Sequence, residues 1–126
     1  MEEENKKKKI LIAEDDEMLV EIYKKKFGNG EYDLTVTTDG KETIDKIRKI
    51  KPDVVLLDLV MPELDGFEVI KLIKQDPETK NIKIIVTSNL GQESEKAKAI
   101  KLGANEFLIK ADYDLNELAD KVKDYL

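Results

Sequence analysis

The sequence predicts an α/β fold in which five strands and five helices alternate, forming a three-layer sandwich with a parallel sheet between two layers of helices. One observation is the alternation of short apolar runs, bounded by turn residues, with longer segments whose apolar residues recur at helical spacing. The other is the run at residues 54–57, which is apolar throughout and ends at Asp58. Such a run is typical of a strand buried on both faces, as in a parallel sheet.

The bounds of the elements follow from these runs and from the turn residues between them. We expect strands at residues 10–13, 33–37, 54–57, 82–86 and 106–109, and helices at residues 17–27, 39–51, 66–74, 93–102 and from 114 onward. Asp114 and Glu117 have the spacing of a capping box at the start of the last helix. The fourth helix is rich in lysine and weakly amphipathic, and its expected inward residues are Ala97 and Ile100.

Composition limits the possible functions. A chain of 126 residues is expected to form one domain, residues 1–126, around a single core. The net charge of −6 argues against direct binding of nucleic acid, because contacts with phosphates need a basic face. The chain has no cysteine and no histidine, which excludes disulfides, thiolate and imidazole metal sites, histidine-dependent triads and a phosphohistidine carrier.

Residues 1–8 are interpreted as a charged lead-in to the first strand. Glutamates precede the lysines in this segment, so its net field is small, and it lacks the apolar core of a signal peptide. No stretch of the sequence approaches the roughly 18 apolar residues of a membrane span. We therefore expect a cytoplasmic protein that does not insert into a membrane.

The topology brings polar residues together at one edge of the sheet. Right-handed crossovers and a flavodoxin-like, doubly wound strand order of 2-1-3-4-5 make the first and third strands neighbours at a switch point, where ligands bind in such sheets. The strands then deliver these residues to their shared carboxyl edge: Glu14, Asp15 and Asp16 after the first, Asp58 after the third, Thr87 and Ser88 after the fourth, and Lys110 after the fifth.

This set of residues indicates phosphoryl chemistry. Clustered carboxylates repel one another, and a hard divalent cation such as Mg²⁺, or Mn²⁺, removes the conflict by taking oxygen ligands. A lysine and a hydroxyl add a positive charge and a hydrogen-bond donor for phosphoryl oxygens, with a carboxylate as covalent acceptor. Each residue also has a plainer interpretation, because Asp58 can simply end a strand or cap a helix, and Lys110 can be a surface charge.

Residues 10–15, residues 56–62 with Gly66, residues 84–87 and residues 107–110 resemble the signature positions of the receiver domain of bacterial two-component response regulators. The resemblance covers nearly the whole chain in the right order. It implies that Asp58 is the phosphoacceptor. It also implies a metal site made by Asp15, Asp58, the backbone carbonyl of Val60, and Glu14 either directly or through a water.

The resemblance assigns three more residues. Thr87 would hydrogen-bond a phosphoryl oxygen, and Lys110 would form an ion pair with it. Phe107 occupies the place of the family's switching aromatic, although a single aromatic in a strand is equally well explained as core. Asp16 is expected to be a helix N-cap instead of a metal ligand.

The function implied is that of a stand-alone, chemotaxis-regulator-like signalling protein. It would take a phosphoryl group from a histidine kinase or histidine phosphotransfer protein and would not be a turnover enzyme. Phosphorylation would change the surface of the fourth helix, fifth strand and fifth helix for a separate downstream effector. The protein is expected to be a monomer or a phosphorylation-linked dimer. A domain cut from a larger protein would have the same sequence.

Two positions depart from the family pattern. Ala111 follows Lys110 where proline is usual, often after a cis bond, so we expect either a trans bond with a rearranged loop or a strained cis bond. Ser88 stands where a small residue, often alanine, is usual.

Three other functions are alternatives to this one. A haloacid-dehalogenase-type phosphatase needs a second aspartate two residues after the first, where this chain has Val60. A mononucleotide binder needs a phosphate loop after the first strand, where this chain is acidic. The third is a receiver-like scaffold that accepts no phosphate, which is disfavoured because every chemical position is filled.

Overall fold

The structure, a computed structural model, describes residues 7–63, 65–89 and 91–126, so most of the predicted lead-in at residues 1–8 lies outside the described residues. Its strands are β1 (Lys9–Ala13), β2 (Asp33–Thr37), β3 (Val54–Asp58), β4 (Lys83–Ser88) and β5 (Glu106–Ile109). Its helices are α1 (Glu17–Phe27), α2 (Gly40–Ile50), α3 (Gly66–Gln75), α4 (Glu93–Leu102), the short 3-10 helix η2 (Lys110–Asp112) and α5 (Leu115–Lys123).

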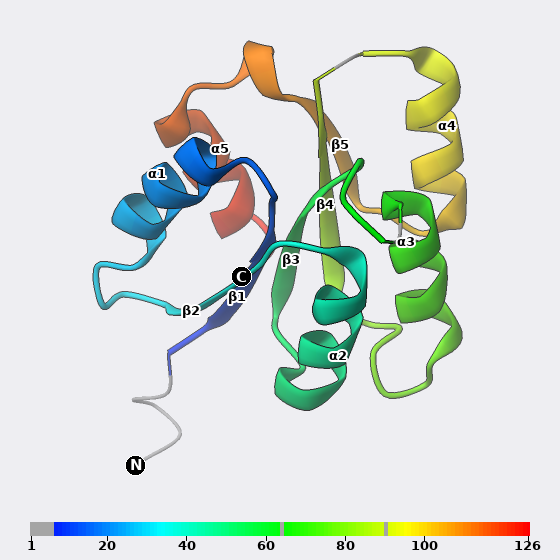
Figure 1. The fold of residues 1–126 in the computed structure, drawn as a ribbon, viewed down its shortest axis with the longest axis horizontal. Coiled ribbons are helices and arrows are strands. Elements are labelled where there is room, and N and C mark those ends of the chain that lie inside the picture. The colour runs from blue at the N-terminus through cyan, green and yellow to red at the C-terminus, as the bar shows by residue number, and fades with distance from the viewer. Residues whose placement is uncertain (1–6, 64, 90) are drawn as a thin grey trace.

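The described strands form one sheet in the order β2-β1-β3-β4-β5, and each neighbouring pair is parallel, which confirms the predicted flavodoxin-like order. The register places Ala13 beside Leu57, and Asp58 beside Thr87. Because all the strands run the same way, their carboxyl ends lie together at one edge, the upper edge in Figure 1. This edge collects the residues that follow the strands.

Helices α1 and α5 cover one face of the sheet, and α2, α3 and α4 cover the other (Figure 1). The central strand β3 is buried along its whole length and contributes to both cores. Val55 and Leu57 pack in the core beneath α2, α3 and α4, whereas Val54 and Leu56 pack beneath α1 and α5. Side chains that alternate between two apolar layers are the reason for the unbroken apolar run in the sequence.

Aspartates begin most of the helices. The Asp16 carboxylate accepts hydrogen bonds from the Met18 and Leu19 amides, which confirms its predicted role as the N-cap of α1. At α5, Asp114 and Glu117 form the predicted capping box, in which each side chain accepts a hydrogen bond from the other residue's backbone. These caps fix where the chain turns from the sheet edge into each helix.

The prediction of the inward residues of α4 is wrong. Ala99 is fully buried, whereas Ala97 is exposed and Ile100 is 43% exposed. The helix has too few apolar residues for its own pattern to set its rotation. Its packing follows the rest of the fold, because Ala99 lies in the core beneath α2, α3 and α4 and Leu102 packs against that core. At the C-terminal end, Gly103 turns the chain at a φ of 121° and lies against the Lys74 side chain of α3, where a Cβ would be 2.8 Å from Cγ.

Strand β4 extends through Ser88, two residues beyond the predicted end at 86, because Thr87 and Ser88 still pair with β5. The polar end of β4 is therefore held rigidly in the sheet. None of the helices in the described part of the chain is both long and apolar enough to cross a membrane.

Candidate functional site

A cavity of about 540 Å³ lies at the carboxyl edge of the sheet. It is lined by Glu14, Asp15, Asp16, Leu19, Asp58, Leu59, Val60, Ser88, Asn89, Glu95 and Lys110. These residues lie at or just after the ends of β1, β3, β4 and β5, or in the first turns of α1 and α4. The cavity thus collects side chains from segments far apart in the sequence, as the strand order requires.

Three carboxylates meet in this cavity. One oxygen each of Glu14, Asp15 and Asp58 lies within 4.8 Å of the others. Glu14 and Asp58 are buried, with 1% and 7% of their surface exposed, while Asp15 is exposed. A set of carboxylate oxygens with one open side fits a hard divalent cation that keeps some of its waters, as Mg²⁺ does.

Lys110 is the cation among these carboxylates. Its Nζ donates to Glu14 Oε1 at 2.8 Å and lies 3.5 Å from Asp58 Oδ2. Burial lowers the pKa of Lys110, but the hydrogen bonds and charges of Glu14 and Asp58 outweigh burial and raise it. Lys110 is therefore a permanent positive charge beside Asp58.

The surroundings of Asp58 favour its neutral form, whereas those of Lys110 favour its charged form. Burial, and then the charge of Glu14, raise the pKa of Asp58 from 3.8 to about 7, although Lys110 and the Val60 amide favour the charged form. The Val60 amide donates to Asp58 Oδ1 over a long 3.4 Å. The Val60 side chain points away and is 72% exposed. The two nearby donors do not compensate for the loss of water around Asp58.

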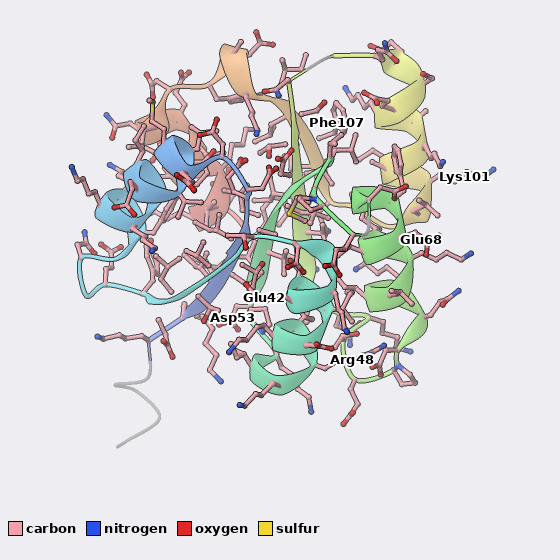
Figure 2. The ribbon with its side chains drawn as sticks, viewed as in Figure 1. Glu42, Arg48, Asp53, Glu68, Lys101 and Phe107 are labelled. Carbon is pink, nitrogen blue, oxygen red and sulfur yellow. The ribbon has the colours of Figure 1, made fainter. Side chains whose placement is uncertain are left out.

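Thr87 and Phe107 lie outside this cavity. The Thr87 hydroxyl makes a long hydrogen bond of 3.5 Å to the Leu57 carbonyl, and Thr87 lines a neighbouring cavity of about 230 Å³ between α1, β5 and α5. Phe107 on β5 is buried in the core shared with α3 and α4 (Figure 2). In this structure the Thr87 hydroxyl therefore pairs with the backbone of β3, and the Phe107 ring is part of the core.

The segment after Lys110 shows which of the two conformations predicted for the Lys110–Ala111 bond the chain adopts. No peptide bond between described residues is cis, so the Lys110–Ala111 bond is trans. The chain continues as η2 before the capping box starts α5. A trans bond with a helical turn therefore connects β5 to α5.

Sequence reasoning missed one residue of the site. Glu95, in the first turn of α4, lines the same cavity as Asp58, and its Oε1 is buried without a hydrogen-bond partner among the residues that the structure describes. The available signal was its position, because a helix that starts soon after β4 must place its first turn near that strand's polar end. The sequence alone did not show which residue of that turn faces inward.

Comparison with known proteins identifies the family. The family model of the response regulator receiver domain matches residues 10–123, and the chain belongs to this family. Members of the family act as signalling switches of two-component systems and pair with histidine kinases and downstream effectors. The family also binds divalent metal at an acidic pocket, which corresponds to the cluster of Glu14, Asp15 and Asp58.

Three relatives illustrate the range of similarity and of length. Chemotaxis protein CheY of Thermotoga maritima is 45% identical over 74 residues, which are 58% of this chain and 59% of CheY. Polar-differentiation response regulator DivK of Brucella anthropi is 28% identical over 113 residues, 90% of this chain and 91% of DivK. The chain spans less than two thirds of CheY and only 21% of response regulator PleD of Caulobacter vibrioides.

Solved structures give the same fold. The receiver domain of Francisella response regulator 1452 superposes with a TM-score of 0.84 at 31% identity, covering 94% of this chain and 95% of that one. The Mn²⁺-bound form of response regulator Rcp1 superposes with a TM-score of 0.78 at 26% identity, covering 93% and 90%.

Proposed function

We propose that this chain accepts a phosphoryl group on Asp58 from a histidine kinase or a histidine phosphotransfer protein. The observation that carries the proposal is the position of Asp58, a buried carboxylate flanked by Glu14 and Lys110 at the edge of the sheet. An acceptor oxygen, a permanent cation and a set of cation ligands in one cavity are the parts that phosphoryl transfer to a carboxylate requires.

The metal site in this proposal consists of Asp15, Asp58, the backbone carbonyl of Val60, and Glu14 either directly or through a water. The donors are all oxygens, and the cluster of three carboxylates is a poor arrangement without a positive charge, so the residues fit Mg²⁺ or Mn²⁺. The Mn²⁺-bound Rcp1 structure supports the choice of ion class. A bound divalent cation would supply neutralisation of the carboxylates and of the phosphoryl oxygens.

The residues of the chain divide the transfer step among them. An Asp58 oxygen forms the new bond to phosphorus while the bond from phosphorus to the donor nitrogen breaks, and its electron pair leaves with the imidazole. The Nζ of Lys110 is 3.5 Å from Asp58 Oδ2, which is close enough for it to form an ion pair with the phosphoryl oxygens once they are bonded to Asp58. Glu14 holds Lys110 in place until then through the 2.8 Å hydrogen bond.

The signal in this proposal passes from the site to the surface of α4, β5 and α5. The Thr87 hydroxyl would break its long, 3.5 Å hydrogen bond to the Leu57 carbonyl and donate to a phosphoryl oxygen instead. Phe107 lies on β5 at the register position beside Val86, one residue from Thr87, and would be the aromatic that responds. Phe107 is buried in this structure, and the proposal requires a second, more exposed position of its ring as well.

Residues 1–126 would act as one receiver domain in the cytoplasm, as a monomer or a phosphorylation-linked dimer. The effector would be a separate protein, and the acidic surface would not contact nucleic acid directly.

The test is labelling by acetyl phosphate with Mg²⁺, followed by intact-protein mass spectrometry. Wild type is expected to gain one phosphoryl group per chain, and Asp58→Asn none. The matched control is Asp65→Asn, because Asp65 is an exposed N-cap of α3 and asparagine caps equally well. Undiminished labelling of Asp58→Asn would refute the assignment, and steady turnover of an aryl phosphate would favour a phosphatase instead.

A further inference from the structure

Glu95 is a carboxylate of the cavity that has no part in the proposed metal site or transfer step. It lies in the first turn of α4 and lines the cavity beside Ser88, Asn89 and Lys110. Its Oε1 is buried and has no hydrogen-bond partner in the described structure. A buried acceptor without a partner is unfavourable, so a donor group that enters the cavity gains by pairing with it.

The two buried carboxylates of the cluster, Glu14 and Asp58, are already engaged, whereas Asp15 is exposed to solvent. Glu14 accepts from the Lys110 ammonium and from the Asp16 amide, and Asp58 accepts from the Val60 amide. Among the described residues, the buried acceptor that a cationic hydrogen-bond donor entering the cavity finds without a partner is therefore Glu95 Oε1, on the α4 side. An entering anionic group meets the negative charge of Glu95 there without any compensating hydrogen bond.

Resting on Asp58 as the phosphoacceptor, we propose that Glu95 selects the chemical class of the phosphodonor. It favours donors whose phosphorus is bonded to nitrogen in a protonated, N–H-bearing group, and it disfavours acyl phosphates. A protonated phosphoimidazole or phosphoramidate presents a cationic N–H to the Glu95 carboxylate. The acyl group of acetyl phosphate has no N–H or O–H donor. Its oxygens carry partial negative charge, which the negative Glu95 carboxylate would repel.

The transfer step needs no proton from the protein. Asp58 forms the oxygen–phosphorus bond, and the nitrogen–phosphorus bond breaks with its electron pair going to nitrogen. The proton already on the leaving group stays there, so protonated phosphoimidazole releases neutral imidazole and zwitterionic phosphoramidate releases ammonia. Glu95 accepts a hydrogen bond from that N–H and holds the donor in its reactive, protonated form.

The experiment compares two small donors on the full chain. The rates of phosphorylation by phosphoramidate and by acetyl phosphate are measured by intact-protein mass spectrometry at one pH and one Mg²⁺ concentration, for wild type, Glu95→Gln and Glu93→Gln. Glu93 is the matched control, because it lies in the same first turn of α4 but is exposed and outside the cavity lining. Both variants remove one charge at the same helix end.

We expect Glu95→Gln to lower the ratio of the phosphoramidate rate to the acetyl phosphate rate by about tenfold, the size of one hydrogen bond to a charged group. Glu93→Gln is expected to leave the ratio unchanged. Glu95→Ala serves as a second variant and is expected to match Glu95→Gln. A merely structural role of Glu95 would change both rates together and keep the ratio constant.

An unchanged ratio in both Glu95 variants would overturn the inference. This failure is distinct from a failure of the proposed function, in which neither donor would label Asp58 in the wild type. Circular dichroism of each variant establishes that the fold is retained before the rates are compared.

Discussion

Removing the charge of Asp58 is expected to stabilise the metal-free protein at alkaline pH, although Asp58 is the proposed site of function. The pKa of Asp58 is about 7 in the folded chain and 3.8 in the reference state. A group whose pKa is raised by folding contributes most stability below its unfolded pKa and loses that contribution as the pH rises through the folded pKa. The window in which stability is lost is therefore about pH 4 to 7.

The magnitude follows from the same two pKa values. A difference of about three pKa units at about 1.4 kcal/mol each corresponds to about 4 kcal/mol when Asp58 is fully charged. Asparagine carries no charge, so Asp58→Asn is expected to be more stable than wild type by up to this amount at pH 8 in EDTA. The two proteins are expected to be nearly equal at pH 4, where Asp58 is protonated.

Urea unfolding followed by circular dichroism measures this difference. The matched control is Asp65→Asn, which removes an exposed carboxylate and is expected to change the free energy of unfolding by less than about 0.5 kcal/mol at either pH. Mg²⁺ is expected to stabilise wild type at pH 8 but not Asp58→Asn. Equal stability of wild type and Asp58→Asn at pH 8 in EDTA would show that Asp58 is not the destabilised carboxylate that its burial implies.

Two further predictions concern the elements that hold the site. Gly66→Ala is expected to lower the free energy of unfolding by about 1–3 kcal/mol, because a Cβ would lie 2.6 Å from the Leu59 carbonyl oxygen, just after Asp58. Urea unfolding measures this change, and an unchanged free energy of unfolding would mean that the backbone at Leu59 shifts at little cost. Asp114→Ala is expected to cost about 1 kcal/mol by removing the cap of α5 while leaving phosphorylation of Asp58 unchanged; a loss of labelling would contradict the separation of cap and site.

The sequence was sufficient to predict the layers and the strand order. The run that ends at Asp58 predicts a buried central strand because its apolar residues are consecutive, and β3 is buried on both faces. Asp16 and Asp114 were predictable as caps because capping depends only on neighbouring residues. Features set by local sequence or by a strong apolar period were thus accessible without the structure.

Features that depend on how separate elements meet were not accessible. The rotation of α4 depends on its packing against the other elements, so the weak apolar pattern pointed to Ile100 instead of Ala99. The sequence placed Lys110 near the carboxylates, but only the folded geometry shows that Glu14 is its nearer partner. Glu95 was missed for the same reason, because its direction depends on where α4 starts.

The two helices beside β5 are anchored very differently. Helix α5 buries Leu118 and Val122 in the core that it shares with α1, whereas the only buried residue of α4 in the described structure is Ala99, in the other core. Substitutions on the exterior of α4 therefore carry little penalty in core packing. New binding preferences can accumulate on this helix during evolution or in the laboratory, while the sheet and the carboxylate site beneath it stay intact.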